Sequence, residues 1–396
     1  MAKAAIMGYG TVGSGVYDII RINAAKLTKS AGEDIDLKYI LDIREFDDHP
    51  EKELFTKDVN DIINDDEVSV VAEVMGGLHP AYEFTKSLLM AGKNVVTSNK
   101  ELVATYGSEL IATAKENGVN YLFEASVGGG IPVLRPLACC LAANNIKKIA
   151  GILNGTTNYI LYQMITNSKS FDMALKDAQA NGYAERNPAA DIEGYDACRK
   201  IAILASLASG FEVDYSEIST EGITNITLDD VKCARELDAV IKLIGYAEFF
   251  ENGKIYAHVA PMMIKNGSML SGVDDVFNAV LINGDAVGDV MFYGPGAGKL
   301  PTASAVVADI VDCIVHKGMS RRIGWIKPRS SIAAGKDDKK FSYFVRADKN
   351  ADITGFGTVT EFRSLGDENV FITEPMTASE MDEARAIVKT AIRILD

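Results

Sequence analysis

Residues 182–200 (GYAERNPAADIEGYDACRK) carry acids and a lysine at spacings that suit binding of a charged substrate and transfer of a proton. Asp196 and Lys200 are four residues apart at the start of a helical pattern, so their side chains share one helix face. The pattern continues as the apolar run 201–205 (IAILA), which indicates a buried helix and argues against an exposed ion pair. A charged pair that leads a buried helix needs polar partners, and a charged substrate would supply them.

A glycine-rich motif near the N-terminus indicates nucleotide binding. Residues 8–13 (GYGTVG) form GxGxxG between a strand pattern over 2–7 and a helical pattern. The glycines permit a tight turn, close approach of a pyrophosphate to the backbone and close packing of helix on strand. A turn without a ligand is the alternative, but the strand–turn–helix context favours a dinucleotide site. Its cofactor-binding residues would be Gly8, Gly10, Thr11, Val12 and Gly13.

Two charged residues after the second predicted strand bear on the choice of dinucleotide. Asp42 follows the strand pattern 37–41, where an acid binds the adenosine ribose hydroxyls, which favours NAD. Arg44 would instead meet the 2′-phosphate of NADP. A solvated acid at the strand end is a third interpretation, so the residues leave NAD and NADP open.

Two further segments begin where strand patterns end. Lys100 follows the strand pattern 94–97, at the sheet edge where doubly wound folds bind ligands, although a solvent-exposed charge explains it equally well. Glu124 opens the run 124–132 (EASVGGGIP), whose backbone carbonyls beside a carboxylate suit a hard cation. A glycine-rich crossover with a capping glutamate is the simpler interpretation of this run.

The elements that hold these residues predict an α/β fold. Strand and helix patterns alternate through residues 2–124, which predicts a Rossmann-type doubly wound parallel sheet. After residue 132 helices mix with antiparallel strand patterns, which indicates an α+β domain. The predicted divisions are a nucleotide-binding domain over 1–132, completed by 296–320, a second domain over 133–295, and a short α+β tail over 341–396.

Within the second half, the apolar patterns predict individual elements. We expect helices over residues 228–245 and 379–395, and strands over residues 343–346 and 370–373.

Composition narrows the class of protein. The 396 residues are 47% hydrophobic and 24% charged, as in a soluble globular protein, and no apolar run is long enough to span a membrane. The net charge of −15 argues against nucleic acid or an anionic membrane as a partner. The first strand pattern starts at residue 2 and the five cysteines are scattered, so we expect a cytoplasmic protein without disulfides.

Several of these segments together closely resemble homoserine dehydrogenase. The family's signature pattern runs here over residues 178–200, with Asn187, Pro188 and Gly194 in place. The resemblance extends over roughly residues 1–325, and a long gapped match is far more specific than a lone GxGxxG. The other segments that carry it are 98–102 (SNKEL), 124–132, 151–161 (GILNGTTNYIL) and 294–298 (GPGAG).

The resemblance implies reversible reduction of L-aspartate 4-semialdehyde to L-homoserine with NAD or NADP, in threonine and methionine biosynthesis. It implies that Lys100 and Lys200 handle the proton and that Asp196 supports Lys200 and the substrate hydroxyl. Glu185 and Asp191 fall where the family binds the amino end of the substrate. The substrate is thus a small molecule, and the second domain would also form the interface of a homodimer or a dimer of dimers.

The same resemblance assigns a cation and two cofactor contacts. Glu124, with the carbonyls of Val127, Gly129 and Ile131, matches a structural monovalent-cation site, for which sodium is the expected ion. Gly296 falls near the cofactor, and Lys100 is expected to contact it as well.

The tail departs from the longer family members, which end in a regulatory ACT domain. Residues 352–355 (DITG) faintly resemble the ligand loop of that domain, but no first helix follows. We therefore expect a truncated remnant that helps dimerisation in preference to a working threonine sensor.

Two other functions compete with homoserine dehydrogenase. The same motifs would also suit another Rossmann dehydrogenase that acts on a related semialdehyde or a 3-hydroxy acid. A semialdehyde dehydrogenase that forms an acyl phosphate would need a cysteine nucleophile. Cys198 lies in residues 182–200 but has no histidine near it in sequence, which argues against that enzyme. A nucleotide-sensing module without enzyme activity would have lost the charged residues of 182–200, and their presence argues against this second alternative.

Overall fold

The computed structural model describes residues 1–321 and 323–395. They form two compact units, each treated by itself below. The first unit comprises Met1–Asn145, Ala202–Tyr215 and Gly294–Ser330, and the second comprises Ile146–Ile201, Ser216–Tyr293 and Ser331–Asp396. The residues of the predicted tail that the structure describes, 341–395, lie in the second unit, and the predicted division into domains stays a prediction.

The first unit is built on a parallel sheet with the strand order β3-β2-β1-β4-β5-β6, so the predicted Rossmann-type sheet is confirmed. The order reverses between β1 and β4, the point at which open α/β sheets bind ligands beyond the strand ends. The strands are β1 (Ala2–Met7), β2 (Ile35–Leu41), β3 (Phe55–Thr56), β4 (Val68–Glu73), β5 (Asn94–Thr97) and β6 (Tyr121–Leu122). The helices are α1 (Thr11–Ile22), α2 (Ala24–Ala31), α3 (Val59–Ile63), α4 (Ala81–Met90), α5 (Lys100–Glu116) and α11 (Lys299–Val315).

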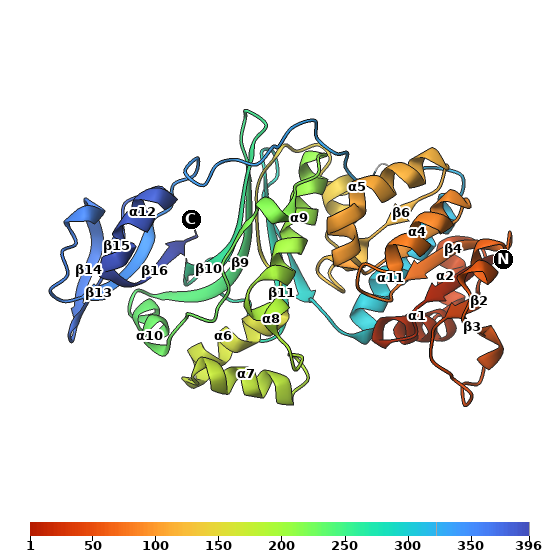
Figure 1. Ribbon diagram of the computed structural model, residues 1–396, viewed down its shortest axis with the longest axis horizontal. Coiled ribbons are helices and arrows are strands. Elements are labelled where there is room, and N and C mark those ends of the chain that lie inside the picture. Colours follow the sequence, from red (N-terminus) through yellow and green to blue (C-terminus); the bar gives the residue numbers. More distant parts are fainter. Residues whose placement is uncertain (322, 396) are drawn as a thin grey trace. The chain divides into compact units, whose positions relative to one another are not determined.

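Helix α11 comes late in the chain but packs on α1 in the first unit (Figure 1). Val16 and Ile20 of α1 share one buried apolar cluster with Ile310 of α11. A Cβ atom on Gly15 would lie 2.8 Å from the carbonyl oxygen of Lys299, so glycine lets the two helices approach closely.

The second unit is a mixed sheet with the strand order β12-β11-β7-β9-β10-β16-β13-β15-β14 and β8 paired to β10. The strands are β7 (Ile146–Ile152), β8 (Ser219–Thr220), β9 (Ala239–Phe249), β10 (Ile255–Lys265), β11 (Phe277–Gly284), β12 (Gly288–Pro295), β13 (Tyr343–Asp348), β14 (Val359–Leu365), β15 (Glu368–Thr373) and β16 (Val388–Ile394). The helices are α6 (Gly155–Asn167), α7 (Phe171–Ala180), α8 (Ala189–Ile192), α9 (Tyr195–Ser209), α10 (Leu228–Glu236) and α12 (Ala378–Ala384), and residues 202–209 of α9 are counted with the first unit.

Two predicted helices were wrong in their C-terminal parts. Helix α10 ends at Glu236, and residues 239–245 of the predicted helix over 228–245 belong to β9. Helix α12 ends at Ala384, and the remainder of 379–395 contains β16. Strand β9 is buried along most of its length, so its apolar run lacks the alternation that separates strand from helix. Strand β16 is only partly buried, and its pairing with β10 and β13 decides its structure. The strands predicted over 343–346 and 370–373 are confirmed by β13 and β15.

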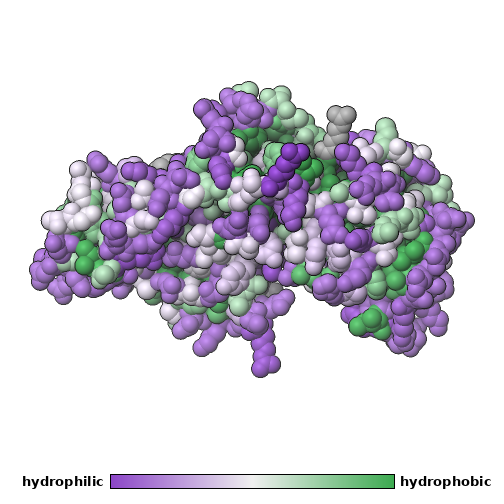
Figure 2. Space-filling model, turned by 45° about the horizontal axis from the view of Figure 1, so that its top comes forward, coloured by the Kyte–Doolittle hydropathy of each residue, from purple (hydrophilic) through white to green (hydrophobic). Residues whose placement is uncertain are grey.

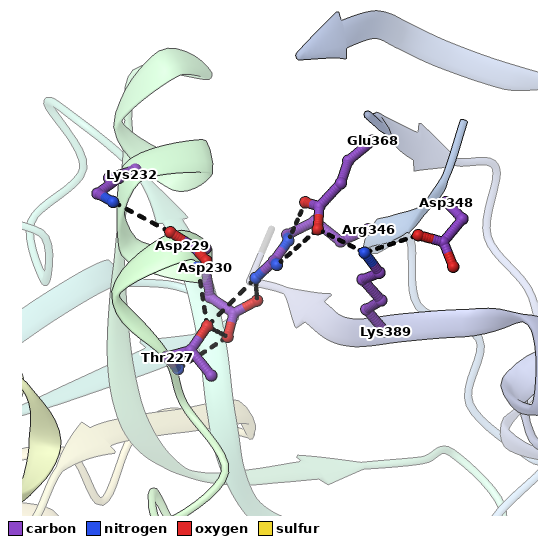
Figure 3. A network of polar contacts seen from close by, with 8 residues as sticks. All are labelled: Thr227, Asp229, Asp230, Lys232, Arg346, Asp348, Glu368 and Lys389. Carbon is purple, nitrogen blue, oxygen red and sulfur yellow. Dashed lines mark hydrogen bonds and ion pairs between the residues drawn. The ribbon is translucent and has the colours of Figure 1, made fainter. Parts of the chain in front are cut away.

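Strand β16 joins the C-terminal residues to the rest of the second unit. It pairs in parallel with β10, through Met262 and Arg393, and antiparallel with β13. A polar network reinforces the join, because the buried guanidinium of Arg346 on β13 contacts Asp230 on α10 and Glu368 on β15 (Figure 3). The C-terminal strands are therefore an integral part of this sheet.

His258 on β10 is a buried histidine that the predicted chemistry does not use. Its ring lies 5.2 Å from the rings of Tyr246 and Phe341, centroid to centroid, and neither ring nitrogen has a hydrogen-bond partner within the described residues. Burial lowers the pKa of His258 well below its usual value, and Arg393 acts in the same direction. The folded protein thus holds His258 neutral.

Acid should destabilise the protein through this histidine. Because the unfolded chain takes up a proton on His258 near pH 6.5 and the folded chain does not, stability falls as pH drops below that value. The loss reaches about 2 kcal/mol at pH 5. We expect His258→Phe to remove this part of the pH dependence, measured as the free energy of unfolding in urea at pH 7.5 and pH 5. The exposed His79, changed to Gln, is the control; equal pH dependence in His258→Phe and the parent would contradict the assignment.

The visible face in Figure 2 is mainly hydrophilic, with small scattered apolar patches, as the acidic composition leads one to expect. No helix within residues 1–321 and 323–395 is both long and apolar enough to cross a membrane.

Candidate nucleotide and substrate sites

The glycine motif forms the turn between β1 and α1. Gly8 has a φ of +96°, a conformation that favours glycine, and a Cβ atom on Gly13 would lie 1.9 Å from the carbonyl oxygen of Gly8. A Cβ atom on Gly10 would meet no atom within 4 Å, so the backbone there borders open space. Gly10 caps α1 without a side-chain hydrogen bond, which leaves the helix N-terminus suited to a pyrophosphate. This turn therefore fits a dinucleotide.

Asp42 and Arg44 are bonded to each other. Asp42 Oδ1 accepts hydrogen bonds from the backbone N–H and Nε of Arg44, each at 3.0 Å. Oδ2 accepts from the N–H of Tyr9 at 2.7 Å and from Arg44 Nη2 at 2.9 Å. The hydrogen bonds from Arg44 lower the pKa of the Asp42 carboxyl. A carboxylate has about four acceptor sites, and these contacts occupy them.

Lys100 begins α5 at the carboxyl end of β5. Asn99 caps this helix by accepting a hydrogen bond from the N–H of Leu102 at 3.1 Å, and its amide donates to the carbonyl of Gly77 at 2.6 Å. Beneath it, the hydroxyl of Thr97 donates to the buried carboxylate of Glu73 at 2.6 Å, and burial raises the pKa of Glu73. Lys100 is thus fixed at the sheet edge where a ligand was predicted.

Glu124 caps the polypeptide segment that follows its glycine-rich run. Its carboxylate accepts hydrogen bonds from the backbone N–H groups of Val133, Leu134 and Arg135, at 2.6, 2.8 and 2.7 Å. The N–H of Glu124 donates to Asp309 on α11 at 2.9 Å, and Arg135 pairs with the same Asp309. Burial raises the pKa of Asp309 to about 7, although Arg135 acts in the opposite direction. These contacts close the loop from Glu124 to Arg135.

The carbonyl groups in this loop are suited to a cation. Val127, Gly129 and Ile131 are buried, and no described residue donates a hydrogen bond to their carbonyl oxygens. Buried carbonyls without donors are costly, and a hard cation prefers oxygen ligands. No cluster of three or more His, Cys, Asp or Glu side chains that would hold a metal occurs in the described part of the chain.

In the second unit, Asp196 and Lys200 lie in the first turns of α9 and form a buried ion pair. Lys200 Nζ donates to Asp196 Oδ2 at 2.7 Å and to the carbonyl oxygen of Leu153 at 2.8 Å. The side chains are 9% and 3% exposed, so the alternative of a solvated surface pair is wrong. A buried lysine held beside a carboxylate is equipped to donate a proton to a bound oxygen as the ammonium and to accept one as the neutral amine.

Asn154 joins two of the predicted site residues and was not itself singled out by its type or spacing. Its amide nitrogen donates to Asp191 Oδ1 at 2.7 Å and to Asp196 Oδ2 at 2.9 Å. Asn154 precedes α6 as its N-cap, a common role for asparagine that gives no indication of a second one. These contacts bring Asp191, Asp196 and Lys200 together.

Glu185 is not part of this group. It is exposed, and its carboxylate makes no hydrogen bond or ion pair with any described residue, while its backbone carbonyl accepts from Gln179 at 3.2 Å. The preceding loop is held by Thr156, whose hydroxyl donates to the carbonyl of Tyr183 at 2.6 Å. A substrate role for Glu185 stays a prediction.

Comparison with known protein families agrees with both halves of this description. A family model described as homoserine dehydrogenase matches residues 132–311, and one described as homoserine dehydrogenase, NAD binding domain, matches residues 8–124.

Individual relatives are similar along most of the chain. Homoserine dehydrogenase of Bacillus subtilis (strain 168) is 44% identical over 313 residues, 78% of this chain and 72% of that protein. The enzyme of Neisseria gonorrhoeae is 37% identical over 390 residues, 96% of this chain and 89% of that protein. The crystal structure of a homoserine dehydrogenase from Thiobacillus denitrificans has a TM-score of 0.91 and 35% identity, covering 100% of this chain and 98% of that one. The structure of a hyperthermophilic archaeal homoserine dehydrogenase in complex with NADPH has a TM-score of 0.68 and 28% identity, and the match covers 79% of this chain and 97% of that one.

Proposed function

The chain belongs to the homoserine dehydrogenase family, and from this premise we propose how its residues carry out the reaction of that family. The reaction is the NAD(P)-dependent, reversible reduction of L-aspartate 4-semialdehyde to L-homoserine in threonine and methionine biosynthesis. The buried Lys200–Asp196 pair is the observation that carries the assignment of roles.

Lys200 and Lys100 are the residues to which we assign the proton. The nicotinamide cofactor supplies or accepts the hydride when bound. Lys200 Nζ stabilises the oxygen of the reacting carbon and protonates it during reduction, and Asp196 orients the ammonium. Lys100 supports the proton transfer. Asp191 and Glu185 bind the ammonium of the amino acid, which opposite charge favours.

An assay of homoserine oxidation, run in parallel with NAD and NADP, tests this function. We expect reduction of the nicotinamide cofactor that depends on L-homoserine. Absence of turnover with either cofactor would remove the proposal, and turnover only with a 3-hydroxy acid would favour the competing dehydrogenase.

NADP is the cofactor that the Asp42–Arg44 pair favours. The contacts from Tyr9 and Arg44 occupy the Asp42 carboxylate, so a ribose hydroxyl would have to displace one of them. The Arg44 side chain is 56% exposed, whereas that of Asp42 is 7% exposed, so the guanidinium faces solvent. A fixed guanidinium is well suited to a 2′-phosphate.

Replacing Arg44 with alanine should therefore raise the KM for NADP by at least about tenfold, the usual effect of losing a hydrogen bond to a charged group. The KM for NAD should change little, because Asp42 becomes free to accept from the ribose. Steady-state kinetics with both cofactors measure this, with the exposed Lys29→Ala on α2 as control. An equal loss with both cofactors would contradict the preference.

The loop from Glu124 to Ile131 is our proposed site for a structural monovalent cation, with sodium as the expected ion. The buried carbonyls of Val127, Gly129 and Ile131 support it. A rise in thermal stability with NaCl beyond that with tetramethylammonium chloride would be the expected result.

Assembly and location complete the proposal. We expect a homodimer or a dimer of dimers, formed by the second unit and measurable by light scattering. Cys139, Cys140, Cys198, Cys233 and Cys313 are free, which suits the reducing cytoplasm. The first helix of an ACT domain has no counterpart in described residues 349–358, where only a short 3-10 turn (Thr354–Phe356) occurs, and this supports a tail without threonine sensing.

A further inference from the structure

The residues at the junction between β7 and α6 contact Asp191, Asp196 and Lys200, the three site residues that lie together in the second unit. The carbonyl of Leu153 accepts from Lys200, and the amide of Asn154 donates to Asp191 and Asp196. The hydroxyl of Thr156 holds the loop at Tyr183. Three of the four residues from Leu153 to Thr156 thus make these contacts, so one short segment holds the site residues in place.

The orientation of the Asn154 amide follows from its hydrogen bonds. Its Oδ1 accepts from the backbone N–H of Thr157 at 2.9 Å, because Asn154 caps α6. The amide nitrogen must then point the other way, toward Asp191 and Asp196, and it donates one N–H to each carboxylate. Asn154 is 6% exposed, so water does not compete freely for these bonds.

The junction is held rigidly by its neighbours. A Cβ atom on Gly155 would lie 2.6 Å from the carbonyl oxygen of Val276, so glycine lets α6 abut that loop. The buried Asn158 donates to the carbonyls of Val273, Asp275 and Phe277, at 3.0, 3.0 and 3.1 Å. The backbone that carries Asn154 is therefore held in place, and this fixes the position of its amide group.

We propose that Asn154 is a positioning residue, which sets the spacing between the carboxylate for the substrate's amino end and the carboxylate beside the reacting oxygen. This inference deepens the proposed function and depends on the roles assigned there to Asp191 and Asp196. One amide bridging both groups fixes their separation, so it selects an amino acid with a hydroxyl at a set distance from its ammonium.

Replacing Asn154 with serine tests the proposal, because serine keeps the helix cap but lacks both amide donors. We expect the KM for homoserine to rise about tenfold through Asp191 and kcat to fall about tenfold through Asp196. The Kd for NADP should stay unchanged. In an Asp191→Ala background the effect on KM should vanish, while the effect on kcat remains. Asn154→Asp, which also keeps the cap but adds a third carboxylate, should lower kcat/KM further.

Ser170→Ala, which removes the cap of α7 in the same unit, is the control for a change in helix stability alone. If the parent enzyme oxidises homoserine and the kcat and KM of Asn154→Ser lie within about twofold of the parent's values, the inference is overturned. The proposed function is then unaffected. A KM effect that persists undiminished in the Asp191→Ala background would also overturn it. A parent without homoserine oxidation would instead remove the proposed function.

Discussion

Lys200→Ala is expected to lower kcat for homoserine oxidation by at least about a hundredfold, the usual scale for loss of an acid–base group. The variant removes the amino group that donates to Asp196 and to the carbonyl of Leu153, so no neutral amine can form there to take the hydroxyl proton. Lys100→Ala should give a loss of the same order. Steady-state kinetics at saturating homoserine measure both.

The binding of NADP separates a catalytic loss from a folding defect. Because the glycine turn lies in the first unit, Lys200→Ala should bind NADP with the parent's Kd, measured by calorimetry. Lys232→Ala is a matched control, since Lys232 forms a helical ion pair with Asp229 in the same unit but is 69% exposed. Near-normal turnover of a variant lacking both Lys100 and Lys200 would contradict the proposed chemistry.

Local sequence signals were sufficient for the nucleotide unit. The patterns over residues 2–124 predicted the strand ends that Gly8, Asp42 and Lys100 follow in the structure, whereas the cofactor and catalytic roles of these residues stay predictions. They did not indicate that Asp42 and Arg44 would be bonded to each other. Two residues apart after a strand, they were read as alternative cofactor contacts, whereas the guanidinium folds back on the carboxylate.

The substrate side was only partly predictable, because its organising contacts are distant in sequence. The i,i+4 spacing of Asp196 and Lys200 is local and was read correctly. Asn154 lies far before Asp191 in the chain, and only the folded sheet brings the end of β7 beside α9. For the same reason β16 was mistaken for helix, since its partners on β10 and β13 decide its structure.

Arg346→Met is expected to destabilise the protein by about 3–5 kcal/mol, the cost of leaving a buried charge without its partner. Arg346 Nη1 donates to Asp230 Oδ1 at 2.5 Å, and Asp230 is fully buried, so its oxygen would lose a charged donor where water does not reach (Figure 3). Nε and Nη2 form a bidentate contact with Glu368 at 2.9 and 3.2 Å. Urea unfolding at pH 7.5 measures the change.

The pH dependence distinguishes this network from a simple loss of packing. The hydrogen bond from Arg346 lowers the pKa of Glu368 to about 2, so the contact stabilises the fold above the unfolded value near 4.3. That stability is lost as pH falls toward 2, and the difference between the parent and Arg346→Met should shrink over the same range. Lys389→Met removes a contact to the same carboxylate from a side chain that is 41% exposed, and should cost at most about 1 kcal/mol. Equal losses for the two variants would mean that burial of Asp230 does not set the strength of the join, and that pairing of β16 with β10 carries it instead.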